Sequence, residues 1–170
     1  MICHLINKLT NMANNEFQRH EIIGRRWFEN FVNQLKIKSI WQPTANTYDF
    51  VDGYLTQGNK KIVIEIKTRN PNYIKYSSHW MELDKFMNLT KTKIDSNCNG
   101  GWYVNFFSED IMYIYDLKNI NTKNCPVIRE WVPKATADRS KGYRWKQFLD
   151  IPTKYAIRFK KVNNKWTRLN

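Results

Sequence analysis

Two stretches of the chain repeat apolar residues at the spacing of an α-helix. The first runs over residues 14–36 and consists of Phe17, Phe28, Phe31, Val32 and Leu35. The second runs over residues 79–94 and consists of Trp80, Leu83, Phe86, Met87 and Ile94. Residues three, four and seven positions apart share one face of a helix, so each pattern predicts an amphipathic helix with its apolar face toward a core.

Between these stretches the pattern changes to the period of two that is typical of β-strands. Residues 61–67 alternate isoleucines with Val63, Glu65 and Lys67, and residues 48–56 before them read as a second strand. Gly58-Asn59 favours a two-residue turn, so the two runs predict an antiparallel hairpin. Glu65 and Lys67 then leave the sheet on one face, where burial is costly unless they pair or bind something charged.

Further strands are predicted over a short run at residues 40–41 and over residues 102–107 and 111–117. The order helix, three strands, helix, two strands predicts an α/β fold with a central mixed β-sheet flanked by helices. In the last third, residues 118–141 predict an extended excursion over the surface, because they are rich in Asn and Lys and contain Pro126 and Pro133. Residues 142–149 predict a short helix, and residues 155–162 with 166–169 predict a terminal hairpin.

The length of 170 residues predicts one domain. We divide it into an irregular N-terminal segment over 1–13, a core over 14–117, and a basic C-terminal extension over 118–170 packed on the same domain. No apolar run approaches the roughly 20 residues of a membrane span, and the first residues lack a signal peptide's pattern, so we expect an intracellular, cytoplasmic protein without membrane contact. Cys3, Cys98 and Cys125 are widely spaced and predict neither a disulfide framework nor a zinc site.

Positive charge is concentrated near the C-terminus. The net charge is +13; residues 1–117 hold 14 Lys and Arg against 12 Asp and Glu, whereas residues 118–170 hold 14 against 3. Tryptophans and tyrosines are interleaved with these basic residues. This composition suits a polyanionic backbone, so we expect a nucleic acid as partner and name Lys141, Arg144 and Lys146 as candidate contacts.

An Asp on one strand, followed after twelve residues by Glu-x-Lys on the next, carries the main functional signal. In this chain the pattern reads Asp52, twelve residues, then Glu65-Ile66-Lys67, with Arg69 just beyond. It resembles the motif of the PD-(D/E)XK nuclease superfamily and is similar to that of its small Holliday-junction resolvases and phage-type endonucleases. The resemblance covers about residues 16–117 and implies a restriction-endonuclease-like αβββαβ core.

The resemblance also implies the chemistry of the site. Asp52 and Glu65 would hold Mg²⁺ or Mn²⁺ together with the main-chain carbonyl of Ile66, and Lys67 would position the attacking water. Arg69 would contact a neighbouring phosphate. Hard oxygen ligands suit Mg²⁺ independently of the resemblance.

Two helical contributions to the site are also implied by the resemblance. The helix before the hairpin would supply a further carboxylate, either Glu21 or Glu29, and Lys85 of the next helix would lie near the phosphate. An ordinary surface position remains open for each of these three residues.

The aspartate of the motif has a rival on the same strand, Asp49. The two aspartates differ by an odd number of positions, so an uninterrupted strand sends them to opposite faces. A two-residue turn at Gly58-Asn59 places Asp52 opposite Glu65, whereas a longer turn or a bulge at Gly53 would favour Asp49. We predict Asp52 as the ligand.

These features favour a Mg²⁺-dependent DNA endonuclease that is structure-guided or weakly sequence-specific, with RNA as an open alternative substrate and a homodimer as a further expectation. A non-catalytic nucleic-acid-binding module that retains the nuclease fold is the alternative, with Glu65 and Lys67 simply paired. A structural protein whose basic tail binds a protein partner is a third class.

Overall fold

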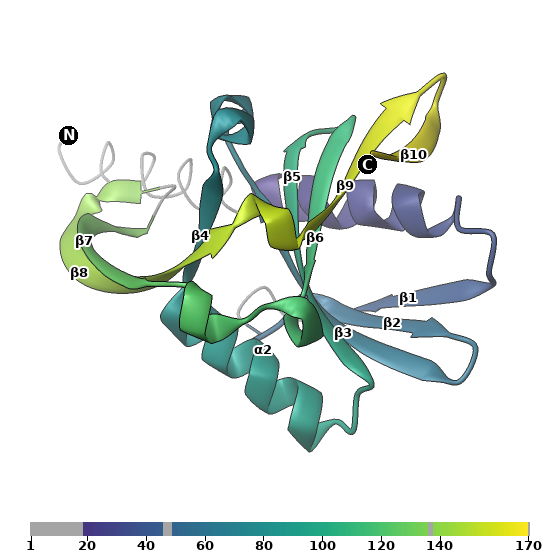
Figure 1. The fold of residues 1–170 in the computed structure, drawn as a ribbon, viewed down its shortest axis with the longest axis horizontal. Coiled ribbons are helices and arrows are strands. Elements are labelled where there is room, and N and C mark those ends of the chain that lie inside the picture. Colours follow the sequence, from purple (N-terminus) through teal and green to yellow (C-terminus); the bar gives the residue numbers. More distant parts are fainter. Residues whose placement is uncertain (1–18, 46–48, 136–137, 170) are drawn as a thin grey trace, which may run out of the picture.

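A seven-stranded mixed sheet forms the centre of the molecule (Figure 1) in this computed structural model, which describes residues 19–45, 49–135 and 138–169. The irregular segment expected over 1–13, and the first residues of the helix expected over 14–36, lie outside these ranges. The sheet has the order β1-β2-β3-β5-β6-β9-β10. The strands are β1 (Ser39–Pro43), β2 (Gly53–Gln57), β3 (Lys60–Thr68), β5 (Gly100–Ser108), β6 (Ile111–Asp116), β9 (Ala156–Val162) and β10 (Lys165–Leu169).

Two helices pack on the opposite faces of this sheet. The first, over residues 19–32, buries Phe28 and Phe31 against Ile62 and Ile64 of β3. Helix α2 (Leu83–Asp95) buries Leu89 in the second core cluster, which contains Val63. Alternation along β3 therefore gives each helix its own side of the sheet, as the apolar patterns predicted. Among the described residues, no helix is long and apolar enough to cross a membrane.

The β2–β3 hairpin has the predicted register. Gln57 pairs with Lys60 across the turn, and the pairing runs without a shift to Gly53 opposite Ile64. Gly58 supplies the positive φ, +58°, that a tight hairpin turn requires. β3 then pairs in parallel with β5 through a connection that contains α2, whereas all other neighbours in this sheet are antiparallel. This confirms the α/β fold with a mixed central sheet flanked by helices.

A second sheet, of three strands in the order β4-β8-β7, was not predicted. It consists of β4 (Ser78–Glu82), β7 (Val127–Ala135) and β8 (Asp138–Pro152). The prediction that a helix begins at residue 79 is wrong, because His79 and Met81 are buried while their neighbours are more exposed, which is the period of a strand. The helix begins only at Leu83.

The short helix predicted over residues 142–149 is also wrong, since these residues form the middle of β8. Aromatic residues alternate with basic ones there, and residues 143–149 pair with β7, as in Trp131 opposite Trp145. Part of the predicted irregular excursion over 118–141 is thus the paired strand β7, preceded by two short 3₁₀ helices, η2 (Leu117–Asn119) and η3 (Thr122–Asn124). Pro126 and Pro133 do not prevent pairing, because one precedes β7 and the other lies next to its irregular end.

The terminal hairpin forms as predicted. Asn163 and Asn164 adopt positive φ angles of 50° and 61° in the turn between β9 and β10. β9 pairs with β6, so residues 156–169 extend the central sheet. The first helix ends at residue 32 rather than 36, because Gln34 and Leu35 donate backbone hydrogen bonds to Phe31 and Val32 in a tighter turn.

Candidate active site

Asp52 and Glu65 are buried at the point where the β2–β3 hairpin begins to open. Each is 6% exposed. The amide of Asp52 donates to the Ile64 carbonyl at 2.9 Å, although Ile64 is the pairing partner of Gly53, so the regular ladder of the hairpin ends at this point. The amide of Ile66 donates to Asp52 Oδ2 at 2.7 Å, so β3 itself orients the carboxylate. This amide belongs to the peptide bond that follows Glu65, so the hydrogen bond holds the Asp52 carboxylate beside Glu65.

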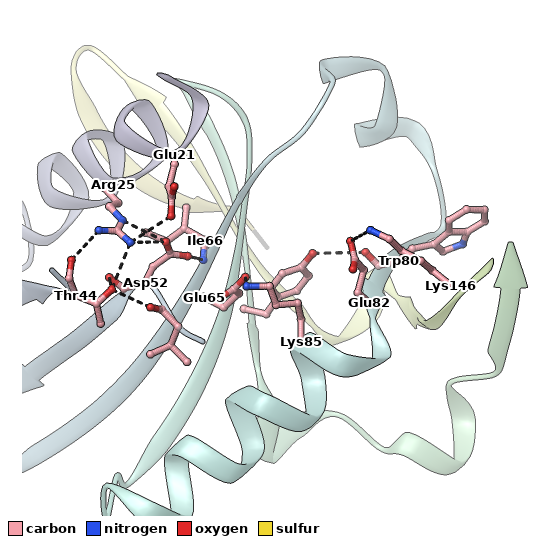
Figure 2. Close-up of polar contacts among 12 residues, drawn as sticks. Glu21, Arg25, Thr44, Asp52, Glu65, Ile66, Trp80, Glu82, Lys85 and Lys146 are labelled. Carbon is pink, nitrogen blue, oxygen red and sulfur yellow. Dashed lines mark hydrogen bonds and ion pairs between the residues drawn. The ribbon is translucent and has the colours of Figure 1, made fainter. Parts of the chain in front are cut away.

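The first helix adds a guanidinium and a second carboxylate (Figure 2). Arg25 donates from Nε to Asp52 Oδ1 at 3.2 Å, from Nη2 to Glu21 Oε1 at 3.3 Å, and from Nη1 to the Thr44 carbonyl at 2.9 Å. The helix lies close to β3 here, since a Cβ built on Gly24 would lie 3.0 Å from the Ile66 side chain. Close packing at Gly24 thus brings the helix near enough for Arg25 to reach Asp52.

Glu21 is incompletely satisfied in this arrangement. Its Oε2 atom is buried and has no hydrogen-bond partner within the described part of the chain. Burial, and next the negative charge of Asp52, raise the pKa of Glu21, while Arg25 opposes both. A buried carboxylate oxygen without a donor is a position where a cation or water would be stabilising.

Glu65 is paired with Lys85 of α2, whose Nζ lies 3.0 Å from Oε1 (Figure 2). Burial, and then the charge of Asp52, raise the pKa of Glu65 from 4.5 to about 7, although Lys85 and Lys67 act in the opposite direction. Lys67 is half-buried on the same face, and burial lowers its pKa, with Glu82 opposing. The site thus holds carboxylates and an ammonium whose charged forms are disfavoured.

β4 borders the site on the side of Lys67. Glu82 accepts a hydrogen bond from Lys146 Nζ of β8 at 3.1 Å, and Figure 2 shows this pair beyond Glu65 and Lys85. Arg69, just past β3, donates to Asn105 Oδ1 at 2.5 Å and to the Tyr103 hydroxyl at 2.7 Å. It also donates to the Trp80 carbonyl. Arg69 therefore ties the second sheet to the central one, whereas the Lys146–Glu82 pair lies within the second sheet.

The structure brings together most of the residues that the sequence singled out. Asp52, Glu65 and Lys67 lie on the hairpin, with Glu21 and Lys85 joined to them by ion pairs. The others lie elsewhere: Asp49 in the bend before Asp52, Glu29 exposed two turns along the helix from Glu21, and Lys141 and Arg144 exposed on β8.

Sequence reasoning missed Arg25, Thr44 and Glu82. Arg25 follows Glu21 by four positions, the spacing of a helical ion pair, and this signal could have identified it. Glu82 carried no such signal, because its strand was assigned to the following helix.

The donor set fits a hard divalent cation. Asp52, Glu65, the Ile66 carbonyl and the unpartnered Glu21 Oε2 are all oxygen ligands, and Mg²⁺ is held by one or two carboxylates while it keeps several waters. Within the described ranges, no three His, Cys, Asp or Glu side chains are already grouped as metal ligands. Positive charge is supplied instead by Arg25 and Lys85.

Comparison with known proteins adds one similar fold. No protein-family model and no curated protein matches the chain. Among solved structures, the chain is similar to a 1.6 Å structure of Hjc, a Holliday junction resolvase from the archaeal hyperthermophile Archaeoglobus fulgidus. The identity is 12%, the match covers 75% of this chain and 88% of the other, and the TM-score is 0.45. The function proposed below therefore rests on the side chains of the site itself.

Proposed function

We propose that this protein is a divalent-metal-dependent DNA endonuclease whose site is built on Asp52, Glu65 and Lys67. The observation that carries the proposal is a pair of buried carboxylates on adjacent strands, with the pKa of Glu65 raised to about 7. Two acidic groups held together out of water are costly. A buried carboxyl whose pKa is raised as that of Glu65 is occurs most often at a functional site, where a bound cation or a reacting proton uses it.

The proposed ligands are Asp52, Glu65 and the carbonyl of Ile66, with Glu21 holding the ion directly or through water. Mg²⁺ or Mn²⁺ would supply Lewis acidity toward a phosphoryl oxygen and make a coordinated water more acidic. The Ile66 amide fixes Asp52, so the carboxylate needs little reorganisation to act as a ligand.

Lys67 and Lys85 have roles toward the substrate in this proposal. Burial lowers the pKa of Lys67, so its ammonium is poorly solvated and gains from a nearby phosphate. It would orient the water and stabilise the charge that develops on the phosphorus oxygens. Lys85 is paired with Glu65 and, when a cation replaces it there, becomes free to contact a neighbouring phosphate. Arg69 would contact the next one.

One observation favours the alternative of a non-catalytic nucleic-acid-binding module. Arg25 lies 3.2 Å from Asp52 and Lys85 lies 3.0 Å from Glu65, so both carboxylates already have a cation beside them. A module of this kind would bind nucleic acid through its basic surface and would need no metal.

Metal titration combined with a cleavage assay separates the two functions. Isothermal titration with Mg²⁺ or Mn²⁺ should show binding, and supercoiled plasmid should be nicked only without chelator; an RNA of matched sequence tests the open substrate. Glu65→Ala and Lys67→Ala should abolish cleavage and leave DNA binding in chelator nearly intact, because they act on the reacting phosphate rather than on the duplex. Glu109→Ala, at an exposed carboxylate in the β5–β6 turn, is the matched control. Cleavage that survives both changes contradicts the proposal.

Two copies of the chain would be needed to cut both strands of a duplex or junction at once. We propose a homodimer on DNA for this reason, and light scattering of the protein with and without a junction substrate tests it. A monomer that makes only nicks would contradict this part.

A further inference from the structure

The β7–β8 hairpin presents a row of exposed aromatic rings that the proposed chemistry does not use. Trp131 and Trp145 are paired across the hairpin and are 54% and 55% exposed; Tyr143 is 42% exposed. Alternation along β8 puts Trp145 and Tyr143 on the same face as Leu149 and Ile151, which are buried in the core. One face of β8 therefore packs on the core near the base of the hairpin, and the same face is exposed to solvent toward the tip.

The three rings form one continuous surface. The centroids of Trp131 and Trp145 are 5.4 Å apart, and Trp131 and Tyr143 are nearly parallel, at 19° with centroids 6.5 Å apart. The guanidinium of Arg129 lies 5.1 Å from the Trp145 ring centre. Residues 127–149 hold six Lys and Arg against two Asp and Glu. Contiguous exposed aromatic surface is unfavourable in water and usually marks a binding site.

The combination of rings and cations indicates the chemistry of the partner. Flat aromatic rings stack on nucleobases, and Arg and Lys beside them contact the phosphates. Only unpaired bases can stack on a protein ring, because the faces of paired bases are already covered by their neighbours in the duplex. An apolar protein partner would not require the excess of positive charge.

We propose that the aromatic face of Trp131, Tyr143 and Trp145 binds an unpaired nucleic-acid strand. This inference deepens the proposed nuclease function and rests on it only for the cleavage step: it assigns the enzyme to DNA that carries an unpaired segment, such as a flap, a tail or a bubble. Binding itself requires no metal and no intact active site.

The strand that carries Trp145 also carries a residue whose ion pair borders the candidate active site. Lys146 follows Trp145 on the opposite face of β8 and pairs with Glu82 at 3.1 Å. The charge of Glu82 in turn acts on Lys67. The rings and this ion pair thus lie on opposite faces of β8 at neighbouring positions.

The test measures binding in chelator, so that it does not depend on cleavage. The probes are a fluorescently labelled oligothymidylate of about 20 nucleotides, a length that exceeds the site size of one small binding domain, and a blunt duplex of the same length. Trp131→Leu and Trp145→Leu keep apolar side chains that suit a strand but remove the rings. Each should weaken single-strand binding by about ten-fold or more. Duplex binding should be unchanged.

Three controls keep the result specific. Trp80→Leu removes an exposed tryptophan from the opposite face of the same sheet and should leave single-strand affinity unchanged. Trp131→Phe keeps a ring and should retain most of the affinity, which distinguishes stacking from a damaged fold. Ring removal should leave the salt dependence unchanged, whereas Arg129→Gln, at the cation beside the Trp145 ring, should flatten it by about 0.7 in slope per lost phosphate contact.

The outcomes separate this inference from the nuclease proposal. Unchanged single-strand binding in the Leu variants, or an equal loss in Trp80→Leu, overturns the inference even if the protein cuts DNA. Selective loss of single-strand binding supports it even if no cleavage is found, and in that case the nuclease proposal alone fails. If the protein cuts, tailed duplexes should be cut faster than blunt ones, and the double Leu variant should lose this preference; retained preference counts against the inference.

Discussion

Replacing Glu65 with glutamine should stabilise the metal-free protein at neutral and alkaline pH. Glutamine has nearly the shape of glutamate and mimics its protonated form without the charge. In the native structure the ionised form of Glu65 is disfavoured by burial and by Asp52, and Lys85 offsets only part of this cost. Glu65→Gln therefore removes the repulsion between the carboxylates of Glu65 and Asp52, and it loses the ion pair between Glu65 and Lys85.

The size of the effect follows from the pKa. The native pKa of Glu65 is about 7 against 4.5 for the unperturbed group, and a difference of this size corresponds to about 3 kcal/mol. Because the native pKa is the higher one, the native state binds the proton more tightly. The stability that this proton supplies is complete below pH 4.5 and is lost as the pH rises to about 7. The advantage of Glu65→Gln should thus grow over the same window.

Urea denaturation followed by tryptophan fluorescence, in chelator and over a series of pH values, measures this difference. At pH 8 the variant should be more stable by about 3 kcal/mol, or by about 6–12 °C in melting temperature for a chain of this size. At pH 4 the two proteins should differ little. Glu109→Gln at an exposed position is the control and should show no such dependence on pH.

Added Mg²⁺ should reverse the order. A ligand that binds only the native state stabilises it in proportion to the logarithm of its concentration over the dissociation constant, and Glu65→Gln lacks a proposed ligand. The wild-type protein should therefore gain stability with Mg²⁺ while the variant gains little. A variant that is less stable than the wild type at pH 8 in chelator, or whose advantage is the same at pH 4, would refute the electrostatic reasoning.

Two further predictions concern the other charges of the site. Asp52→Asn should lose metal binding by calorimetry and cleavage of plasmid, because the Ile66 amide holds the Asp52 carboxylate beside Glu65, while Asp49→Asn should keep most of both; the reverse result would assign the ligand to Asp49. Lys85→Met should bind Mg²⁺ more tightly, since the ammonium 3.0 Å from Glu65 no longer competes with the ion, yet cleave more slowly because a phosphate contact is lost; weaker Mg²⁺ binding would argue against competition.

The hairpin and its carboxylates could be predicted from the sequence because their signals are local. The alternation over residues 61–67 and the Gly58-Asn59 turn define both strands and their register up to Gly53 opposite Ile64. The helix over residues 19–32 and the terminal hairpin follow from equally local patterns. Arg25 could also have been found, from its spacing to Glu21.

The second sheet could not be predicted in the same way, because its pairing joins distant parts of the chain. β4 contacts β8 in antiparallel register, with Glu82 opposite Phe148, and no local pattern indicates that partner. β4 lies directly before α2 in the chain. Trp80 of β4 has the spacing that would continue the apolar face of this helix, so the apolar residues are equally compatible with a helix that begins earlier. The alternation of Tyr143, Arg144 and Trp145 was present, but a stretch of basic and aromatic residues is compatible with either a helix or a strand when the partner strand is unknown.

The position of β4 gives the second sheet its relation to chemistry. β4 lies between the motif strand β3 and helix α2 in the chain, so any displacement of the β7–β8 hairpin acts on the segment that carries Lys85. Arg69 strengthens this connection, because it directly follows β3 in the chain and donates a hydrogen bond to the Trp80 carbonyl in β4. Glu82, the last residue of β4, accepts a hydrogen bond from Lys146 of β8. Its negative charge acts to raise the pKa of Lys67, against the effect of burial. A strand of nucleic acid bound on the hairpin would thus be held by the sheet whose Glu82 acts on Lys67, and this would couple substrate shape to the proposed site of cleavage.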